Sequence, residues 1–158
     1  MSSVTPASEL RDLYRELILD HARSPRNFGK LDSVSHEAEG INPLCGDKLK
    51  LYFSVDQDDV IQDAKFEGSG CAISVASASL LTDTVIGMKT DQAMSYFSAV
   101  TTLLSGNEST ANQTEVDLGK LKALQGVRAF PSRVKCATLA WHGLNSAINN
   151  DKQTVSTE

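Results

Sequence analysis

The chain has 158 residues, of which 41% are hydrophobic and 22% charged, and it carries a formal net charge of −5. This length and composition are typical of one domain that buries its own core without disulfide bonds. The acidic residues are spread out and no clustered basic face is expected, which argues against nucleic-acid binding. The first ten residues lack the basic start and apolar core of a signal peptide. No apolar run approaches the ~18 residues of a membrane helix, so we expect a cytoplasmic protein.

Apolar residues recur at helical spacing near the N-terminus and predict a first helix. This helix should end near Ser24, because Pro25 disfavours the helical conformation in the residue before it. Residues 33–39 could form a short edge strand. The positions that define the helical spacing are Leu10, Leu13, Tyr14, Leu17, Ile18 and His21.

Residues 48–55 alternate between polar and apolar side chains, which is the pattern of a half-buried strand. Residues 57–59 have the composition of a turn. Residues 60–67 then provide a returning strand, so the two segments predict an antiparallel hairpin. The apolar positions of the first strand are Leu49, Leu51, Phe53 and Val55.

Helices dominate the rest of the predicted structure. Residues 71–86 are small or apolar on all sides, as in a buried helix, and a second helix follows Thr90. Residues 105–117 are polar and predict a loop. Residues 118–124 predict a short helix that ends at Gly126, and Pro131 should start a last helix. We therefore expect one α+β domain over residues 1–158, with a small antiparallel sheet of about three strands and helices on one face. Residues 1–9 and 151–158 are expected to be flexible.

The chain contains three cysteines, whereas a secreted disulfide framework normally uses an even number. In an intracellular protein, metal binding or catalysis explains such cysteines better than disulfide formation. The alternative is that each cysteine is a small buried hydrophobic residue.

The predicted elements place these cysteines at distinct points. Cys45 lies in a loop before the hairpin, Cys71 opens the buried helix, and Cys136 lies near the start of the last helix. A helix N-terminus favours an anion and lowers the pKa of a thiol. Asp47 can turn toward Cys45 because Gly46 permits a sharp bend, and three thiolates with one carboxylate would fill a tetrahedral metal site. There is no C-x-x-C pair, so spacing alone does not assign these residues to one site.

Several separate motifs occur in the order found in one known family. They are Leu13-Tyr14, Asp20-His21, Ser24-Pro25-Arg26-Asn27, Asn42-Pro43-Leu44-Cys45-Gly46-Asp47, the stretch from Ala64 to Ser74, Ala76-Ser77-Ala78-Ser79, Ala123-Leu124-Gln125-Gly126-Val127, and Arg133-Val134-Lys135-Cys136-Ala137-Thr138-Leu139. On these residues the chain resembles the U-type iron–sulfur cluster assembly scaffolds (NifU N-terminal/IscU-like), and most of all their SufU-like branch. The resemblance extends from Leu13 to about Asn149.

The resemblance implies that Cys45, Asp47, Cys71 and Cys136 converge and bind Zn²⁺. It implies that Cys45 accepts persulfide sulfur from a SufS-like cysteine desulfurase, whose histidine would replace Cys45 on the zinc. The sulfur would then pass to downstream cluster assembly proteins. The sequence does not fix the oligomeric state, for which we expect a monomer or weak dimer. Arg133 could stabilise the developing charge by hydrogen bonding, or could simply be a solvated helix residue.

One position separates the branches of this family. IscU-like scaffolds carry a histidine immediately before the third cysteine, where this chain has Lys135. This difference favours a zinc-dependent, sulfurtransferase-type acceptor over a scaffold that holds a [2Fe–2S] cluster or iron. A third alternative is a binding module with a purely structural zinc. His21 is predicted to be a surface or capping residue, and His36 and His142 receive no role.

Overall fold

The computed structural model describes residues 7–105, 117–151 and 153–157. Their arrangement confirms the predicted α+β class, with the hairpin, the buried helix and the last helix at the expected places. The elements in chain order are α1 (Ala7–Arg23), β1 (His36–Asn42), β2 (Asp47–Val55), β3 (Ile61–Ser69), α2 (Ala72–Val85), α3 (Thr90–Ser105), the 3₁₀ helix η1 (Gly119–Val127), α5 (Pro131–Ile148) and β4 (Val155–Ser156).

The strands form a mixed sheet of four, in the order β3-β2-β1-β4. The first three are antiparallel, with Ala38 opposite Leu51 and Phe53 opposite Ala64. β4 pairs in parallel with β1, with Gly40 opposite Val155. The prediction of about three antiparallel strands therefore missed β4, because a strand of two residues is too short to show any periodicity. β1 also begins and ends three residues later than the predicted segment 33–39.

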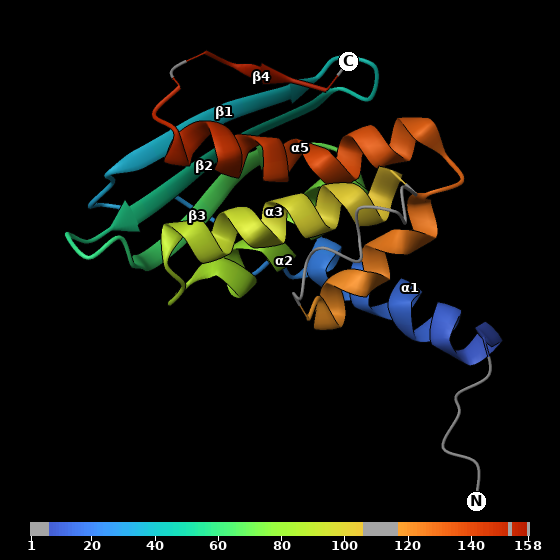
Figure 1. The fold of residues 1–158 in the computed structure, drawn as a ribbon. Coiled ribbons are helices and arrows are strands. Elements are labelled where there is room, and N and C mark those ends of the chain that lie inside the picture. Colours follow the sequence, from blue (N-terminus) through green and yellow to red (C-terminus); the bar gives the residue numbers. More distant parts are fainter. Residues whose placement is uncertain (1–6, 106–116, 152, 158) are drawn as a thin grey trace, which may run out of the picture.

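Helices cover one face of this sheet (Figure 1). α5 packs on β1 and β2, α2 packs on β3, and the two helices contact each other. A further layer follows, in which α1 packs on α2 and α3 packs on α5. Gly143 permits the close approach of α5 to the sheet, since a Cβ atom there would lie 2.7 Å from Cδ1 of Leu51.

The core lies between the sheet and the α2–α5 layer. Trp141, Phe53 and Phe66 are its largest fully buried side chains. The buried serines of α2 satisfy their hydroxyl groups within this core, as buried polar groups must. Ser77 Oγ, for example, donates to the Ala137 carbonyl and accepts from Trp141 Nε1 at 3.2 Å. Ala137 and Trp141 of α5 are both fully buried in this core.

Some predicted segments fall outside the described residues. These are residues 106–116 of the predicted loop and residues 1–6, 152 and 158 of the two ends. Helix α1 begins at Ala7, and β4 occupies residues 155–156 of the predicted flexible C-terminal segment. Among the described helices, none has both the length and the apolar character needed to cross a lipid bilayer.

Candidate metal centre

A tight turn between β1 and β2 carries the first two candidate residues. Asn42 ends β1 and Asp47 begins β2, and the two stand opposite each other in the ladder. The turn closes with a hydrogen bond from the Cys45 N–H to the Asn42 carbonyl at 3.2 Å, and Gly46 takes the left-handed conformation at φ +72°. Glycine adopts that conformation without a steric penalty. The Cys45 thiol is consequently exposed at the tip of a compact turn.

Asp47 lies inside the protein because the strand alternation of β2 places it on the face of Leu49 and Leu51. Its side chain is only 2% exposed. The carboxylate oxygen Oδ1 accepts a hydrogen bond from the Cys71 N–H at 2.8 Å. This contact needs a glycine at position 70, because a Cβ atom there would lie 2.5 Å from the same oxygen. Asp47 thus links the end of the hairpin to the start of α2, where the helix dipole favours its negative charge.

Cys71 and Cys136 approach from two helices. Cys71 is the N-terminal cap residue of α2, in agreement with its predicted place at the start of the buried helix, and it is half-buried. Cys136 is the sixth residue of α5 and is buried, with 1% of its surface exposed. Burial raises the pKa of the Cys136 thiol far above its ordinary range, and hydrogen bonding with Asp47, Cys45 and Cys71 adds to the shift. The expected lowering of the Cys136 pKa by the helix dipole is therefore wrong for the metal-free protein, because desolvation outweighs the dipole.

The structure brings three of the four predicted residues into one cluster. The ligand atoms of Cys45, Asp47 and Cys136 all lie within 4.8 Å of one another. Cys71 lies beside this cluster, because its backbone N–H donates to Asp47 Oδ1 and its thiol helps to raise the pKa of Cys136, but its sulfur is outside the 4.8 Å group. Two sulfurs on one zinc ion lie about 3.8 Å apart, given Zn–S bonds of ~2.3 Å. The Cys45 and Cys136 sulfurs, at most 4.8 Å apart, would therefore need to approach by no more than about 1 Å to share an ion.

Arg133 occupies a different position from the cluster. It is exposed on the first turn of α5, and its guanidinium lies 4.6 Å from the centre of the Phe130 ring. This distance is typical of a cation–π contact. No hydrogen bond joins Arg133 to a thiol among the described residues, so the predicted contact with a developing thiolate would require its side chain to turn away from Phe130.

The histidines lie away from the cluster, and one of them corrects a prediction. The sequence predicts His21 at the surface, yet it is 2% exposed, and its Nδ1 lies 2.7 Å from Ser79 Oγ. The small side chain of Ser79 leaves room for the imidazole between α1 and α2. Burial lowers the pKa of His21, and the nearby Arg26 charge lowers it further. Burial also lowers the pKa of His142, whose ring stacks edge-on against Phe97.

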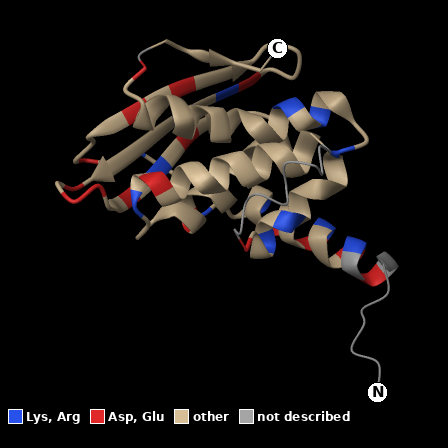
Figure 2. Cartoon of the chain, in the orientation of Figure 1, with Lys and Arg blue, Asp and Glu red and all other residues tan. Residues whose placement is uncertain are grey.

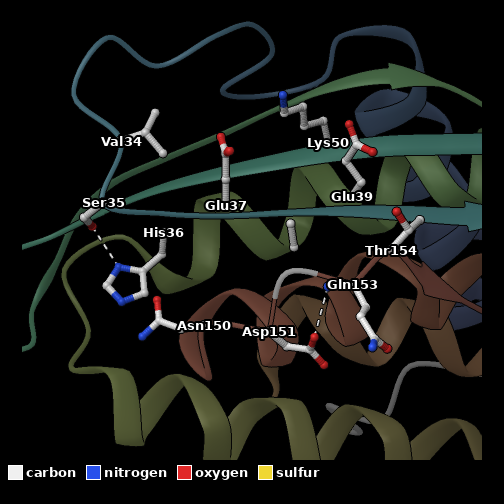
Figure 3. A pocket seen from close by; sticks show the side chains of 11 residues that line it. Val34, Ser35, His36, Glu37, Glu39, Lys50, Asn150, Asp151, Gln153 and Thr154 are labelled. Carbon is white, nitrogen blue, oxygen red and sulfur yellow. Dashed lines mark hydrogen bonds between the residues drawn. The ribbon is translucent and has the colours of Figure 1, made fainter.

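A cavity of about 480 Å³ lies between the free part of the β1 edge and the segment before β4 (Figure 3). His36 lines it, with its Nδ1 atom 2.8 Å from Ser35 Oγ. The rest of the lining is largely polar and includes Glu37, Glu39 and Asp151. None of the three cysteines lines this cavity, so the donor cluster rather than the cavity defines the candidate centre.

Sequence reasoning missed one residue of the centre, Asn42. Its side chain is fully buried, and Nδ2 lies 3.4 Å from Cys136 Sγ and 3.5 Å from Asp47 Oδ2. A signal for this residue was present in the strand alternation. Asn42 follows Ala38 and Gly40 on the buried side of β1, so the alternation of the strand places its polar amide among residues that face the core.

Comparison with known proteins extends these observations. Residues 13–153 match the family described as the NifU-like N-terminal domain. The zinc-dependent sulfurtransferase SufU of Bacillus subtilis is 41% identical over 92% of this chain and 95% of its own length. The iron–sulfur cluster assembly scaffold protein IscU of Streptococcus pyogenes is also 41% identical, over 89% of this chain and 86% of its own.

The fold supports the same assignment. The solved N-terminal structure of a nitrogen-fixing NifU-like protein from Brucella abortus superposes with a TM-score of 0.74. It covers 90% of this chain and 96% of the other at 23% identity, which is evidence for the fold alone. Because the family match spans nearly the whole chain and includes every residue of the donor cluster, this protein belongs to the NifU-like N-terminal domain family.

Proposed function

We propose that this chain is a zinc-binding acceptor of persulfide sulfur, which it takes from a cysteine desulfurase and passes on to iron–sulfur cluster assembly. The observation that carries this proposal is the graded exposure of one donor cluster. Cys45 is exposed, whereas Asp47 and Cys136 are buried beside it. An acceptor thiol must be reachable by a partner, while the residues that activate it must be held in place.

Cys45, Asp47, Cys71 and Cys136 are the residues that would hold the zinc ion. Three sulfurs and one carboxylate are a donor set that zinc accepts. When bound, zinc would favour the thiolate forms without undergoing redox change. The aspartate and the exposed turn of Cys45 distinguish this arrangement from a purely structural zinc site, where four firmly held ligands suffice. All three cysteines are free thiols, which is consistent with the cytoplasmic location that we propose.

The sulfur transfer needs only groups that the two proteins supply. The Cys45 thiolate attacks the terminal sulfur of the persulfide on the desulfurase. A new sulfur–sulfur bond forms at Cys45, the bond within the partner's persulfide breaks, and the partner's cysteine leaves as a thiolate. The product is a persulfide on Cys45. The chain thereby acts as the co-substrate of its partner and not as a free-standing enzyme.

The partner would meet a rim that is apolar and basic. Leu44 and Phe130 are 68% and 47% exposed. Arg133 and Lys135 lie near the N-terminal end of α5, the helix that carries Cys136 (Figure 2). Within the described residues, neither Arg133 nor Lys135 pairs with a carboxylate. Such a rim supports docking of a protein with a complementary acidic surface.

The second candidate is a scaffold on which a [2Fe–2S] cluster is built. The relatives' names include both a sulfurtransferase and scaffolds at equal identity, so the names alone do not separate the two functions. Lys135 precedes Cys136 where a histidine would offer a further ligand, and an ammonium group is not a metal ligand while it is charged. Position 135 therefore favours the sulfur acceptor.

Metal analysis and mass spectrometry test the proposal together. The purified protein should contain one zinc and no stoichiometric iron or sulfide, and a cysteine desulfurase with cysteine should add the mass of one sulfur atom at Cys45. Cys45→Ser should abolish that addition, and Arg133→Gln should slow it. Stoichiometric iron and sulfide with a visible absorption band would favour the scaffold instead. An unchanged stimulation of the desulfurase by Cys45→Ser would refute the acceptor role.

A further inference from the structure

Asn42 contacts all three members of the donor cluster. Its carbonyl oxygen accepts the Cys45 N–H at 3.2 Å and so closes the turn. Its side-chain Nδ2 donates to Cys136 Sγ at 3.4 Å and to Asp47 Oδ2 at 3.5 Å. The residue is 0% exposed, so these contacts lie inside the protein, where electrostatic interactions are stronger than in water.

The orientation of the Asn42 amide follows from the hydrogen-bonding character of the two metal-ligand atoms beside it. Its Oδ1 atom is buried without a hydrogen-bond partner. A buried amide that served only the stability of the fold would be expected to satisfy this oxygen. The opposite orientation would point Oδ1 at a carboxylate oxygen and a sulfur, which are both hydrogen-bond acceptors when ionised. The amide therefore directs its N–H groups at the Asp47 carboxylate and the Cys136 sulfur, although its own oxygen is left without a hydrogen-bond partner.

We propose that Asn42 is a positioning residue of the metal centre. Its N–H groups hold the Asp47 carboxylate and the Cys136 sulfur next to each other and stabilise negative charge on both atoms. A neutral amide does this without adding a charge to the buried cluster. Residues that orient metal ligands in this way typically contribute a factor of 10–100 to metal affinity. The inference rests on the proposed zinc binding.

The test compares variants that change the side-chain N–H groups of Asn42 with a control substitution at a buried residue away from the cluster. Asn42→Leu keeps most of the volume and removes both N–H donors, while Asn42→Ser restores one hydroxyl donor and also covers the case that leucine prevents folding. Ser79→Ala is the control, because Ser79 is equally buried and makes two side-chain hydrogen bonds away from the cluster. Zinc affinity is measured by competition with a chromophoric chelator, the site geometry by the absorption spectrum of bound Co²⁺, and stability by urea unfolding of the metal-free protein.

We expect Asn42→Leu to raise the zinc Kd by roughly 10- to 100-fold and to shift the Co²⁺ spectrum. Asn42→Ser should recover part of the affinity. Ser79→Ala should lower the stability but leave the Kd and the spectrum unchanged. If the wild type binds zinc and Asn42→Leu binds it equally well with the same spectrum, the positioning role is refuted and the zinc site stands. If the wild type itself binds no zinc, the site and the role of Asn42 are refuted together.

Discussion

Replacing Gly70 with alanine should damage the centre without touching any of its donors. The φ angle of Gly70 is outside the left-handed region, so alanine meets no backbone strain there. Its Cβ atom would, however, lie 2.5 Å from both Asp47 Oδ1 and Ser74 Oγ, roughly 1 Å closer than van der Waals contact allows. Asp47 must then move by about that distance, which breaks its 2.8 Å hydrogen bond from the Cys71 N–H.

The expected loss of stability combines the broken hydrogen bond with the steric overlap. A hydrogen bond to a charged group contributes about 1.5–3 kcal/mol, and overpacking of a buried site costs about 1–3 kcal/mol. We therefore expect Gly70→Ala to lower the unfolding free energy of the metal-free protein by about 2.5–6 kcal/mol and to weaken zinc binding. Urea unfolding and chelator competition measure the two quantities.

A matched glycine provides the control for this prediction. Gly126 lies in η1, where a Cβ atom would meet no other atom within 4 Å, and its φ is also outside the left-handed region. Gly126→Ala should therefore change the stability by no more than about 0.5 kcal/mol. Equal stability and equal zinc affinity for the two variants would refute the inference that Gly70 provides the space for the Asp47 carboxylate.

Three further predictions concern pH, the core and the metal. Between pH 7 and 5 the unfolding free energy of the wild type should fall more steeply than that of His21→Gln, and the two slopes should differ by at most ~1.4 kcal/mol per pH unit. The reason is that burial lowers the pKa of His21 in the folded protein, so the unfolded chain binds a proton at a higher pH than the folded chain does. Equal slopes in urea unfolding at each pH would contradict this. Trp141→Phe should cost about 1–3 kcal/mol, since it removes the hydrogen bond to Ser77 and leaves a cavity, and thermal unfolding by calorimetry would show it. A chelator should lower the Tm of the zinc-loaded wild type but not that of Cys136→Ser, as scanning fluorimetry can check.

Local sequence pattern is sufficient for the main elements because each has a long, regular period. The alternation from Leu49 to Val55 predicts β2, and the apolar run after Cys71 predicts the buried α2. Burial of His21 is not predictable in the same way. Its place near the end of α1 suggests a terminal residue, and only the packing of α1 on α2 brings Ser79 within 2.7 Å of its ring.

The donor cluster requires long-range information. Cys45 and Cys136 are 91 positions apart in the sequence, and no local spacing rule connects them. The family motifs identify the residues, but the structure shows that the Cys71 sulfur is not part of the group that Cys45, Asp47 and Cys136 form. It also shows the role of Asn42, whose contacts depend on three elements meeting at one point.

The α+β class, the order of the principal elements and the identity of the candidate metal ligands are predictable from the sequence, because periodicity and motif order are properties of neighbouring residues. Only the tertiary structure shows the fourth strand, the burial of His21 and Cys136, and the upward direction of the Cys136 pKa shift. Each of these depends on desolvation or pairing between segments that are distant in the chain, and such contacts exist only once the sheet and helices have packed together.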